Sequence, residues 1–439
     1  MKYCLIIFII FIFSGCANKE PQVEKKVYSS EIYDLVNIPQ KASKFTKGVN
    51  FTPMSYINQR EYEESYFTPW NMDKPNMRIE EIIWPLRSYK PSNSYGENLK
   101  PINKSFFIQM KNEFNLEKYG SLNKKAITLK YTNIRALPTN KPVLLDPTKA
   151  GEGFPFDYLQ NSTIQANKPI FVSHYSKSGE WAFVFSSFTF GWIQSNELVF
   201  LEKNYTDIWQ GAQQIFLTKE DIALYSDSGK FLFNSKIGTM LALVDESEEF
   251  YTILTVSSAS LEEPLFIKSK ISKLIASKNS LAFNASNLES IIDEVSKSNY
   301  GWGGMYSQRD CSSMLRDMFA PFGIWLPRNS YMQSKIGEII SLSELSDTQK
   351  LNIIKSKALP FKTLLYKKGH IMLYVGIYNE QVIVFHDTWG IKTLKDGIEG
   401  RIIVGKPVFS SLKLGAKQEF YDEKSEMLRN LKSMNILNY

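Results

Sequence analysis

The sequence YGWGGMYSQRDCSSMLRDMF, at residues 300–319, places a cysteine between a glycine-rich segment and an amphipathic helix. Leu315, Met318 and Phe319 share one face of the helix predicted over 311–319. Cys311 therefore lies at a helix N-terminus, where free backbone N–H groups and partial positive charge favour a thiolate and can bind an oxyanion. Taken alone, this position also suits a structural thiol.

Two histidines follow Cys311 on adjacent predicted strands. The two strands follow each other directly along the chain and therefore form a hairpin. His370 opens the first strand and His386 closes the second. A loop centred on Tyr378 would place the histidines opposite each other, and one centred on Asn379 would offset them by two residues on one face. A two-residue loop would break the match. Because thiol acyl transfer needs a nucleophile, a base and an orienting group, these three residues are the predicted catalytic set. The alternative is a pair of strand-end histidines facing solvent.

The N-terminus predicts export. Lys2 and the apolar run 3–13 are typical of a secretory signal, because the run is short for a membrane span. Small residues before Cys16 resemble a bacterial lipobox, in which this cysteine is acylated after cleavage. An uncleaved anchor helix is the alternative. Cys311 would then be the only thiol of the mature chain, and an intramolecular disulfide could not form.

A chain of 439 residues is too long for a single domain. Short β-prone runs separated by turns predict two small β-barrels, whereas helices followed by strands predict a C-terminal α+β domain. Trp181 and Trp192 are expected in the core of the first barrel, and His174 on its surface. We expect the following domains: a signal peptide at 1–15, a tether at 16–45, a mixed N-terminal domain at 46–128, barrels at 129–205 and 206–280, and the α+β domain at 281–439.

Charge and composition exclude several functions. The chain has 52 Lys and Arg against 45 Asp and Glu, a diffuse net charge of +7 that suits an anionic membrane or cell wall. It has no basic-aromatic element of the kind that binds nucleic acid. Three scattered histidines without paired cysteines argue against zinc, and phosphate and dinucleotide fingerprints are lacking. We therefore expect no cofactor.

Four motifs in order resemble the NlpC family of cell-wall cysteine peptidases, which have a papain-like fold. They are the segments YGWGG to RDCSS (300–313), LPRNSYMQ (326–333) and GHIMLYVG (369–376), and then His386. Asn299 departs from the family, in which proline is common before the tyrosine. Upstream, RALPT (135–139) and GEGFPFDYLQ (151–160) resemble the first of two bacterial SH3-like domains, which follow a cap domain in multidomain members.

The resemblance implies an endopeptidase that cuts the γ-D-glutamyl–diamino acid bond of peptidoglycan stem peptides with a free N-terminal L-Ala. Cys311 would attack, His370 would be the base and His386 its orienting partner. Asp310 would bind the substrate ammonium group. Tyr300 and Ser330 would be further residues of the substrate cleft. Arg309 or Arg328 would face a stem carboxylate, and surface solvation is the alternative for both. Phe156, Asp157 and Tyr158 would form the side of the cleft that the first barrel contributes, and turn structure is the alternative for them.

Two other functions are compatible with the same motifs. One is a catalytically silent lipoprotein that binds the cell wall through its barrels, and the other is a thiol amidase or acyltransferase. The expected partners are peptidoglycan or muropeptide stem peptides and, through the lipid on Cys16, a membrane. Ala17 favours the outer membrane, facing the periplasm, by the enterobacterial sorting rule. We expect a monomer in the bacterial cell envelope.

Overall fold

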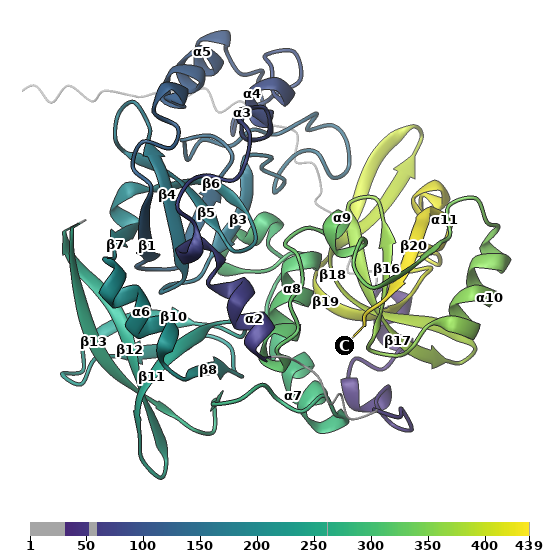
Figure 1. Cartoon of the computed structure of the whole chain (residues 1–439). Helices are drawn as coiled ribbons and strands as arrows, with labels where there is room; N and C mark the ends of the chain where they lie inside the picture. Colours follow the sequence, from purple (N-terminus) through teal and green to yellow (C-terminus); the bar gives the residue numbers. More distant parts are fainter. Residues whose placement is uncertain (1–30, 52–58, 261, 439) are drawn as a thin grey trace, which may run out of the picture. The chain divides into compact units, whose positions relative to one another are not determined.

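The C-terminal domain is built on an antiparallel sheet. In the computed structural model, which describes residues 31–51, 59–260 and 262–438, its strand order is β15-β20-β16-β17-β18-β19 (Figure 1). The strands are β15 (Glu338–Ser341), β16 (Thr363–Lys367), β17 (His370–Tyr378), β18 (Gln381–Lys395), β19 (Ile398–Ser411) and β20 (Leu431–Ile436). Helices α7 (Ala285–Val295) and α8 (Cys311–Phe319) pack on one face. The other face carries α10 (Asp347–Lys357) and α11 (Met427–Asn430).

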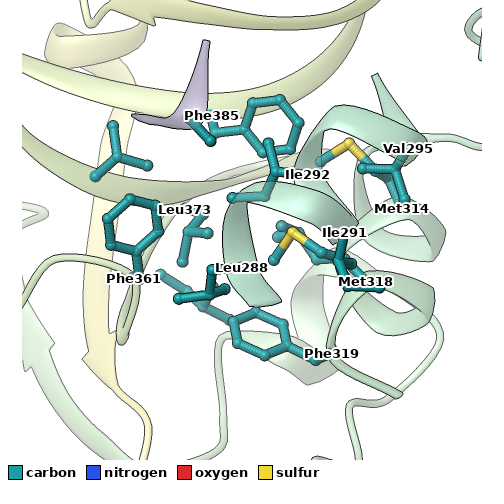
Figure 2. Packing of buried hydrophobic residues seen from close by; sticks show 14 of the residues in the cluster. Leu288, Ile291, Ile292, Val295, Met314, Met318, Phe319, Phe361, Leu373 and Phe385 are labelled. Carbon is teal, nitrogen blue, oxygen red and sulfur yellow. The ribbon is translucent and has the colours of Figure 1, made fainter. Parts of the chain in front are cut away.

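The core between α7, α8 and the sheet follows from sequence periodicity. The apolar stripe of α7 is fully buried against Met314 and Met318 of α8 and against Leu373 and Phe385 of the sheet (Figure 2). Residues that alternate along β17 enter different cores, so that Leu373 faces α8 while Met372 faces the α10 side. This two-sided burial fixes α8 against β17, and with it the positions of Cys311 and His370.

The β17–β18 hairpin has the two-residue loop that was expected to separate the histidines. Asn379 and Glu380 both have positive φ, 46° and 62°, as type I′ turns require. A register shift between residues 374 and 376 makes Val375 an extra residue on β17. Beyond this bulge residue 373 pairs with 385, so 372 faces 386. The bulge thus returns His370 and His386 to one face of the sheet, offset by two residues.

The first barrel has the sheet order β3-β2-β6-β5-β4-β1-β7. Its strands are β1 (Lys124–Thr128), β2 (Thr132–Arg135), β3 (Gln160–Ile164), β4 (Pro169–Tyr175), β5 (Trp181–Ser186), β6 (Phe190–Gln194) and β7 (Leu198–Phe200). Strand β1 had been assigned to the N-terminal domain. Trp181 and Trp192 are buried, as predicted. The prediction for His174 is wrong: it is fully buried and hydrogen-bonds the carbonyl of Phe114, because the N-terminal domain covers it.

The second barrel region contains a larger and a smaller sheet. The larger has the order β13-β12-β11-β8-β14, and β9 pairs with β10 in the smaller. The elements are α6 (Lys203–Gly211), β8 (Gln214–Leu217), β9 (Ile222–Tyr225), β10 (Phe231–Ser235), β11 (Met240–Glu246), β12 (Phe250–Ser260), β13 (Glu263–Ser272) and β14 (Ala276–Ser277). The turn at Ser226–Gly229 matches the turn signal in this part of the sequence.

The N-terminal domain is helical in its described part. It contains α2 (Gln59–Tyr66), α3 (Ile79–Ile82), α4 (Trp84–Ser88) and α5 (Lys104–Glu113). Trp70 is fully buried and its indole N–H donates to the carbonyl of Ala126 in β1, at 2.8 Å. The domain is therefore packed directly on the first barrel.

Residues 32–45 are not the tether that the sequence predicted. They contain α1 (Tyr33–Asn37), and the Asp34 carboxylate accepts hydrogen bonds from the N–H and hydroxyl of Ser411, at 2.9 and 2.7 Å. Phe45 stacks on Phe409, with ring centroids 4.9 Å apart. Polar composition concealed these anchors. The predicted signal peptide, Cys16 and the tether up to residue 30 lie outside the described residues. Within the described ranges, no helix is long and apolar enough to cross a membrane.

Candidate active site

Cys311 is the first residue of α8, where the sequence predicted it. The side chain of Asp310 caps the helix by accepting from the N–H of Ser313, at 2.9 Å. In return, the N–H of Asp310 donates to the hydroxyl of Ser313. This reciprocal capping box explains why the helix starts here. Cys311 is 6% exposed as a residue, and its sulfur accepts a hydrogen bond from the backbone N–H of Ile371, so it lies beside the start of β17.

The two histidines form a chain of hydrogen bonds with a serine. Nε2 of His370 lies 2.8 Å from Nδ1 of His386, and Nε2 of His386 lies 2.8 Å from Oγ of Ser410. Ser410 donates its proton to the carbonyl of Ser411, so it must accept from Nε2–H of His386. His386 then accepts from Nε2–H of His370, and this network assigns the free lone pair of His370 to Nδ1.

Burial favours the neutral form of both Cys311 and His370. Burial raises the pKa of Cys311 to about 12, and the negative charge of Asp310 adds to this effect. Burial lowers the pKa of His370 well below its ordinary value, with further contributions from His386 and Lys367. Burial of the sulfur therefore opposes the thiolate that the helix N-terminus favours.

Asp310 is held by an arginine. Its carboxylate accepts from Nη1 and Nη2 of Arg328, at 3.0 and 2.7 Å, and also from the hydroxyl of Ser312. Burial alone would raise the pKa of Asp310, but Arg328 and these hydrogen bonds hold it below its usual value. Nε of Arg328 donates to Ser162 of the first barrel, at 2.6 Å. Arg328 thus links the barrel to the helix cap, and a substrate ammonium group at Asp310 would compete with it.

Arg309 points away from the cleft. Its side chain is 2% exposed and donates to Asp317 of α8 at 2.8 Å, to Glu220 at 2.9 Å and to the carbonyl of Ile237 at 3.0 Å. It therefore joins α8 to the second barrel. The prediction that Arg309 contacts substrate is wrong for this reason: neighbouring residues of an extended segment point in opposite directions, so that Arg309 and Asp310 face different domains.

A cleft of about 300 Å³ opens beside His370. It is lined by Tyr300 and Trp302, by Phe156 of the first barrel, and by residues of the β18–β19 hairpin that include Trp389. The ring of Trp302 lies 5.1 Å from that of Phe156, and its N–H donates to the carbonyl of Asp157, at 2.9 Å. The barrel therefore forms one wall of the cleft, as the resemblance implied for Phe156.

Other predicted cleft residues lie outside the lining of this cavity. The carboxylate of Asp157 is buried and accepts from Arg135, at 2.6 Å, so it serves the barrel turn. The hydroxyl of Tyr158 donates to the carbonyl of Gly151. Ser330 begins the short helix α9 (Ser330–Gln333) and is half-buried. The turn alternative thus describes Asp157 better than a substrate contact does.

The glycines of the quoted segment permit close approach of the first barrel. Gly303 and Gly304 have φ of 57° and 86°. A Cβ on Gly303 would meet the carbonyl oxygen of Gln160 at 2.5 Å, and one on Gly304 would meet the hydroxyl of Thr163 at 2.1 Å. Only glycine satisfies both the backbone conformation and this contact with β3.

Sequence reasoning missed Ser410, Trp302 and Trp389, and it missed the buried acid Asp387. Asp387 follows His386 on β18, is fully buried and has no side-chain partner among the described residues. Burial raises the pKa of Asp387 well above its usual value, and the charge of Asp310 raises it further. Trp302 could have been found as a site residue, because it lies next to Gly301 in the glycine-rich segment. Nothing in the sequence marks Ser410 in this way.

The family models match four consecutive segments. Residues 297–399 match the NlpC/P60 family, and residues 5–119 match the NLPC_P60 stabilising domain, N term. Residues 142–194 match an SH3 domain of SH3b1 type and residues 204–248 an SH3 domain of SH3b2 type. No curated protein sequence matches this chain.

A solved structure shows the same fold. An NlpC/P60 endopeptidase from Photobacterium damselae subsp. piscicida is similar with a TM-score of 0.78 and 23% identity, over 91% of this chain and 97% of that one. An NlpC/P60 family protein from Bacillus cereus is similar with a TM-score of 0.46 and 15% identity, over 71% of this chain and 98% of that one. This chain belongs to the NlpC/P60 family, with a papain-like α+β catalytic domain that follows a stabilising domain and two SH3-like domains.

Proposed function

We propose that this protein is a cysteine peptidase that hydrolyses peptidoglycan stem peptides. The observation that carries the proposal is the chain from His370 through His386 to Ser410, which begins next to Ile371, the residue whose N–H donates to the sulfur of Cys311. Membership of the NlpC/P60 family supports a cell-wall peptidase. The similar Photobacterium protein is described as an endopeptidase.

The substrate bond that we propose is the γ-D-glutamyl–diamino acid bond of stems with a free N-terminal L-Ala. A cleft of about 300 Å³ walled by the first barrel suits a short peptide better than an intact glycan strand. The aromatic wall formed by Phe156 and Trp302 supports recognition of the end of a chain, because it closes the cleft on the barrel side.

In the mechanism that we propose, Nδ1 of His370 accepts the thiol proton as the sulfur of Cys311 attacks the γ-glutamyl carbonyl. Backbone N–H groups at the start of α8, that of Cys311 among them, stabilise the oxyanion. His370 returns the proton to the leaving amine, and a water molecule then hydrolyses the thioester with His370 as base. The neutral resting pair supports proton transfer during attack rather than before it.

The test is turnover of L-Ala-γ-D-Glu-diamino acid tripeptide by the wild type and by Cys311→Ala. We expect the wild type to release the free diamino acid and the variant to release none, with products identified by mass spectrometry. Negligible release by both proteins would refute the peptidase and leave a wall-binding role. Release of whole stems from muramyl peptides would instead identify an amidase.

We also propose that Cys16 carries lipid and anchors the chain to the outer membrane, facing the periplasm. The support is the sequence pattern around Cys16. Metabolic labelling with a radioactive fatty acid should mark the wild type and fail to mark Cys16→Ser. Membrane fractionation of the two proteins then tests the location, and light scattering of the soluble variant tests the expected monomer.

A further inference from the structure

The cleft beside His370 carries uncompensated positive charge. Lys367, Lys368, Lys392 and Arg401 line it, and within the described chain no aspartate or glutamate does. Lys392 is neutralised, because its ammonium lies 2.6 Å from Glu399 and 3.4 Å from Asp422. The other three cations form no ion pair with any described residue. A concave wall of one sign concentrates ligands of the other sign, so the cleft favours anions.

Arg401 has a buried donor without a partner. Nη1 of this side chain is inaccessible to solvent and makes no hydrogen bond in the described structure. Burial lowers the pKa of Arg401, and no acid nearby raises it. A buried guanidinium N–H without an acceptor is costly and rare in folded proteins.

The guanidinium of Arg401 is also held in place before any ligand binds. Its centre lies 5.6 Å from the ring centroid of Phe156, and Nη2 donates to the carbonyl of Lys149, at 3.2 Å. The next residue of this loop is held as well, since the N–H of Ala150 donates to the carboxylate of Glu399, at 3.0 Å. The first barrel thus fixes the guanidinium of Arg401 in the wall of the cleft, and a guanidinium is the side-chain group best suited to binding carboxylates.

We propose that Arg401 is a specificity-determining residue that binds a free carboxylate of the substrate. This inference rests on the peptidase function proposed above. A stem peptide offers this chemistry in two places, the α-carboxylate of D-glutamate and the carboxylates of the diamino acid. Lys367 and Lys368 add positive charge to the same cleft and raise the affinity for an anionic peptide.

A purely structural role for Arg401 makes a different prediction. If Arg401 only clamps the Lys149 loop to β19, its loss should impair cleavage of every peptide to the same extent. If it binds a carboxylate, its loss should impair only the peptides that carry that carboxylate. The experiment therefore compares ratios of kcat/KM between peptides, which a clamp would leave unchanged.

Three tripeptides test the proposal on the full chain: one with free carboxylates, one with D-isoglutamine in place of D-glutamate, and one with the diamino acid amidated. We expect the wild type to lose roughly 10- to 100-fold in kcat/KM on one amidated peptide, which identifies the carboxylate. Arg401→Gln should bring that ratio to within about twofold, and Arg401→Lys should retain part of it. Arg429→Gln, which removes an exposed arginine of α11, is the control for net charge.

Two results would overturn the proposal. One is wild-type cleavage of all three peptides at rates within about twofold, and the other is an equal loss on all three in Arg401→Gln. Absence of turnover by the wild type would refute the peptidase instead. Calorimetric binding of the same peptides to Cys311→Ala still tests Arg401 in that case: the amidated peptide should bind more weakly, and equal binding would reject the carboxylate site.

Discussion

Ser410→Ala is the change that tests the proposed catalytic chain most directly. Ser410 lies outside the cleft lining, and its hydrogen bond to His386 links it to the proposed reaction. Without the hydroxyl, Nε2–H of His386 loses its acceptor, and the imidazole can exchange the proton between its nitrogens. In the other tautomer His386 would donate towards His370, which would turn the lone pair of His370 away from the sulfur.

The structure sets the size of the effect. One hydrogen bond of a fully buried imidazole is worth about 1–2 kcal/mol. At 1.36 kcal/mol for each tenfold change in rate, kcat should fall about 5- to 30-fold. KM should change little, because Ser410 does not line the cleft. Ser411→Ala is the matched control, since this neighbouring hydroxyl donates to Asp34 rather than to a histidine.

The assay has a kinetic and a spectroscopic part. Tripeptide hydrolysis is measured for Ser410→Ala in the wild-type and His386→Ala backgrounds; the loss should be about 5- to 30-fold in the first and under about twofold in the second. The chain has three histidines, so ¹⁵N-labelled histidine resolves each ring, and the Nε2–H signal of His386 should change in Ser410→Ala. Equal losses in both backgrounds, or an unchanged ring spectrum, would refute the tautomer argument.

Three further predictions follow from the buried charges. Arg309→Met should lower the free energy of unfolding by about 3 kcal/mol, because it leaves Glu220 and Asp317 in the interior with one cation fewer; Arg309→Lys should lose less in urea unfolding, and a loss under about 1 kcal/mol for Arg309→Met would contradict us. Burial raises the pKa of Asp387, so the folded protein holds the proton of this carboxyl more tightly than the unfolded chain does. The contribution of this proton to stability is fully present below the unfolded pKa of about 3.9, and it is lost as pH rises towards the folded pKa. The stability advantage of Asp387→Asn should therefore grow above about pH 4, whereas a constant difference from pH 4 to 8 would count against a neutral buried acid. Alkylation of Cys311 by iodoacetamide should be slow at pH 7 and rise continuously to pH 10, in line with a pKa of about 12; a plateau below pH 7 would indicate a preformed ion pair.

Local features of this chain can be predicted from the sequence alone. The start of α8 follows from a capping residue next to an apolar stripe, and both signals lie within a few residues of Cys311. The strands of the β17–β18 hairpin follow from β-prone runs on either side of a turn pair. Such signals survive in the sequence because helix caps, turns and periodic burial depend on neighbours along the chain.

The alignment of the two histidines needed more than this local information. The turn at Asn379 fixes a register that would separate His370 from His386, and the bulge at Val375 corrects it. No residue at the bulge predicts it clearly. Gly376 has a φ of 131° in the structure, but a glycine at this place in the sequence also fits an ordinary strand. A bulge arises where the side chains on the two faces of a strand must fit different cores, and that fit involves residues distant in sequence.

The amino-acid order of this protein thus specifies its helix starts, its strand pairs and the residues that we propose as reacting groups, because each of these depends on short-range chemistry. Packing of the barrels against α8 settles the rest. It pairs Asp310 with Arg328, turns Arg309 towards the second barrel and leaves the donor of Arg401 unmatched beside Phe156. The raised pKa of Cys311 and the charge of the cleft follow from this packing, since desolvation and ion pairing act through space between residues that are not neighbours in the sequence.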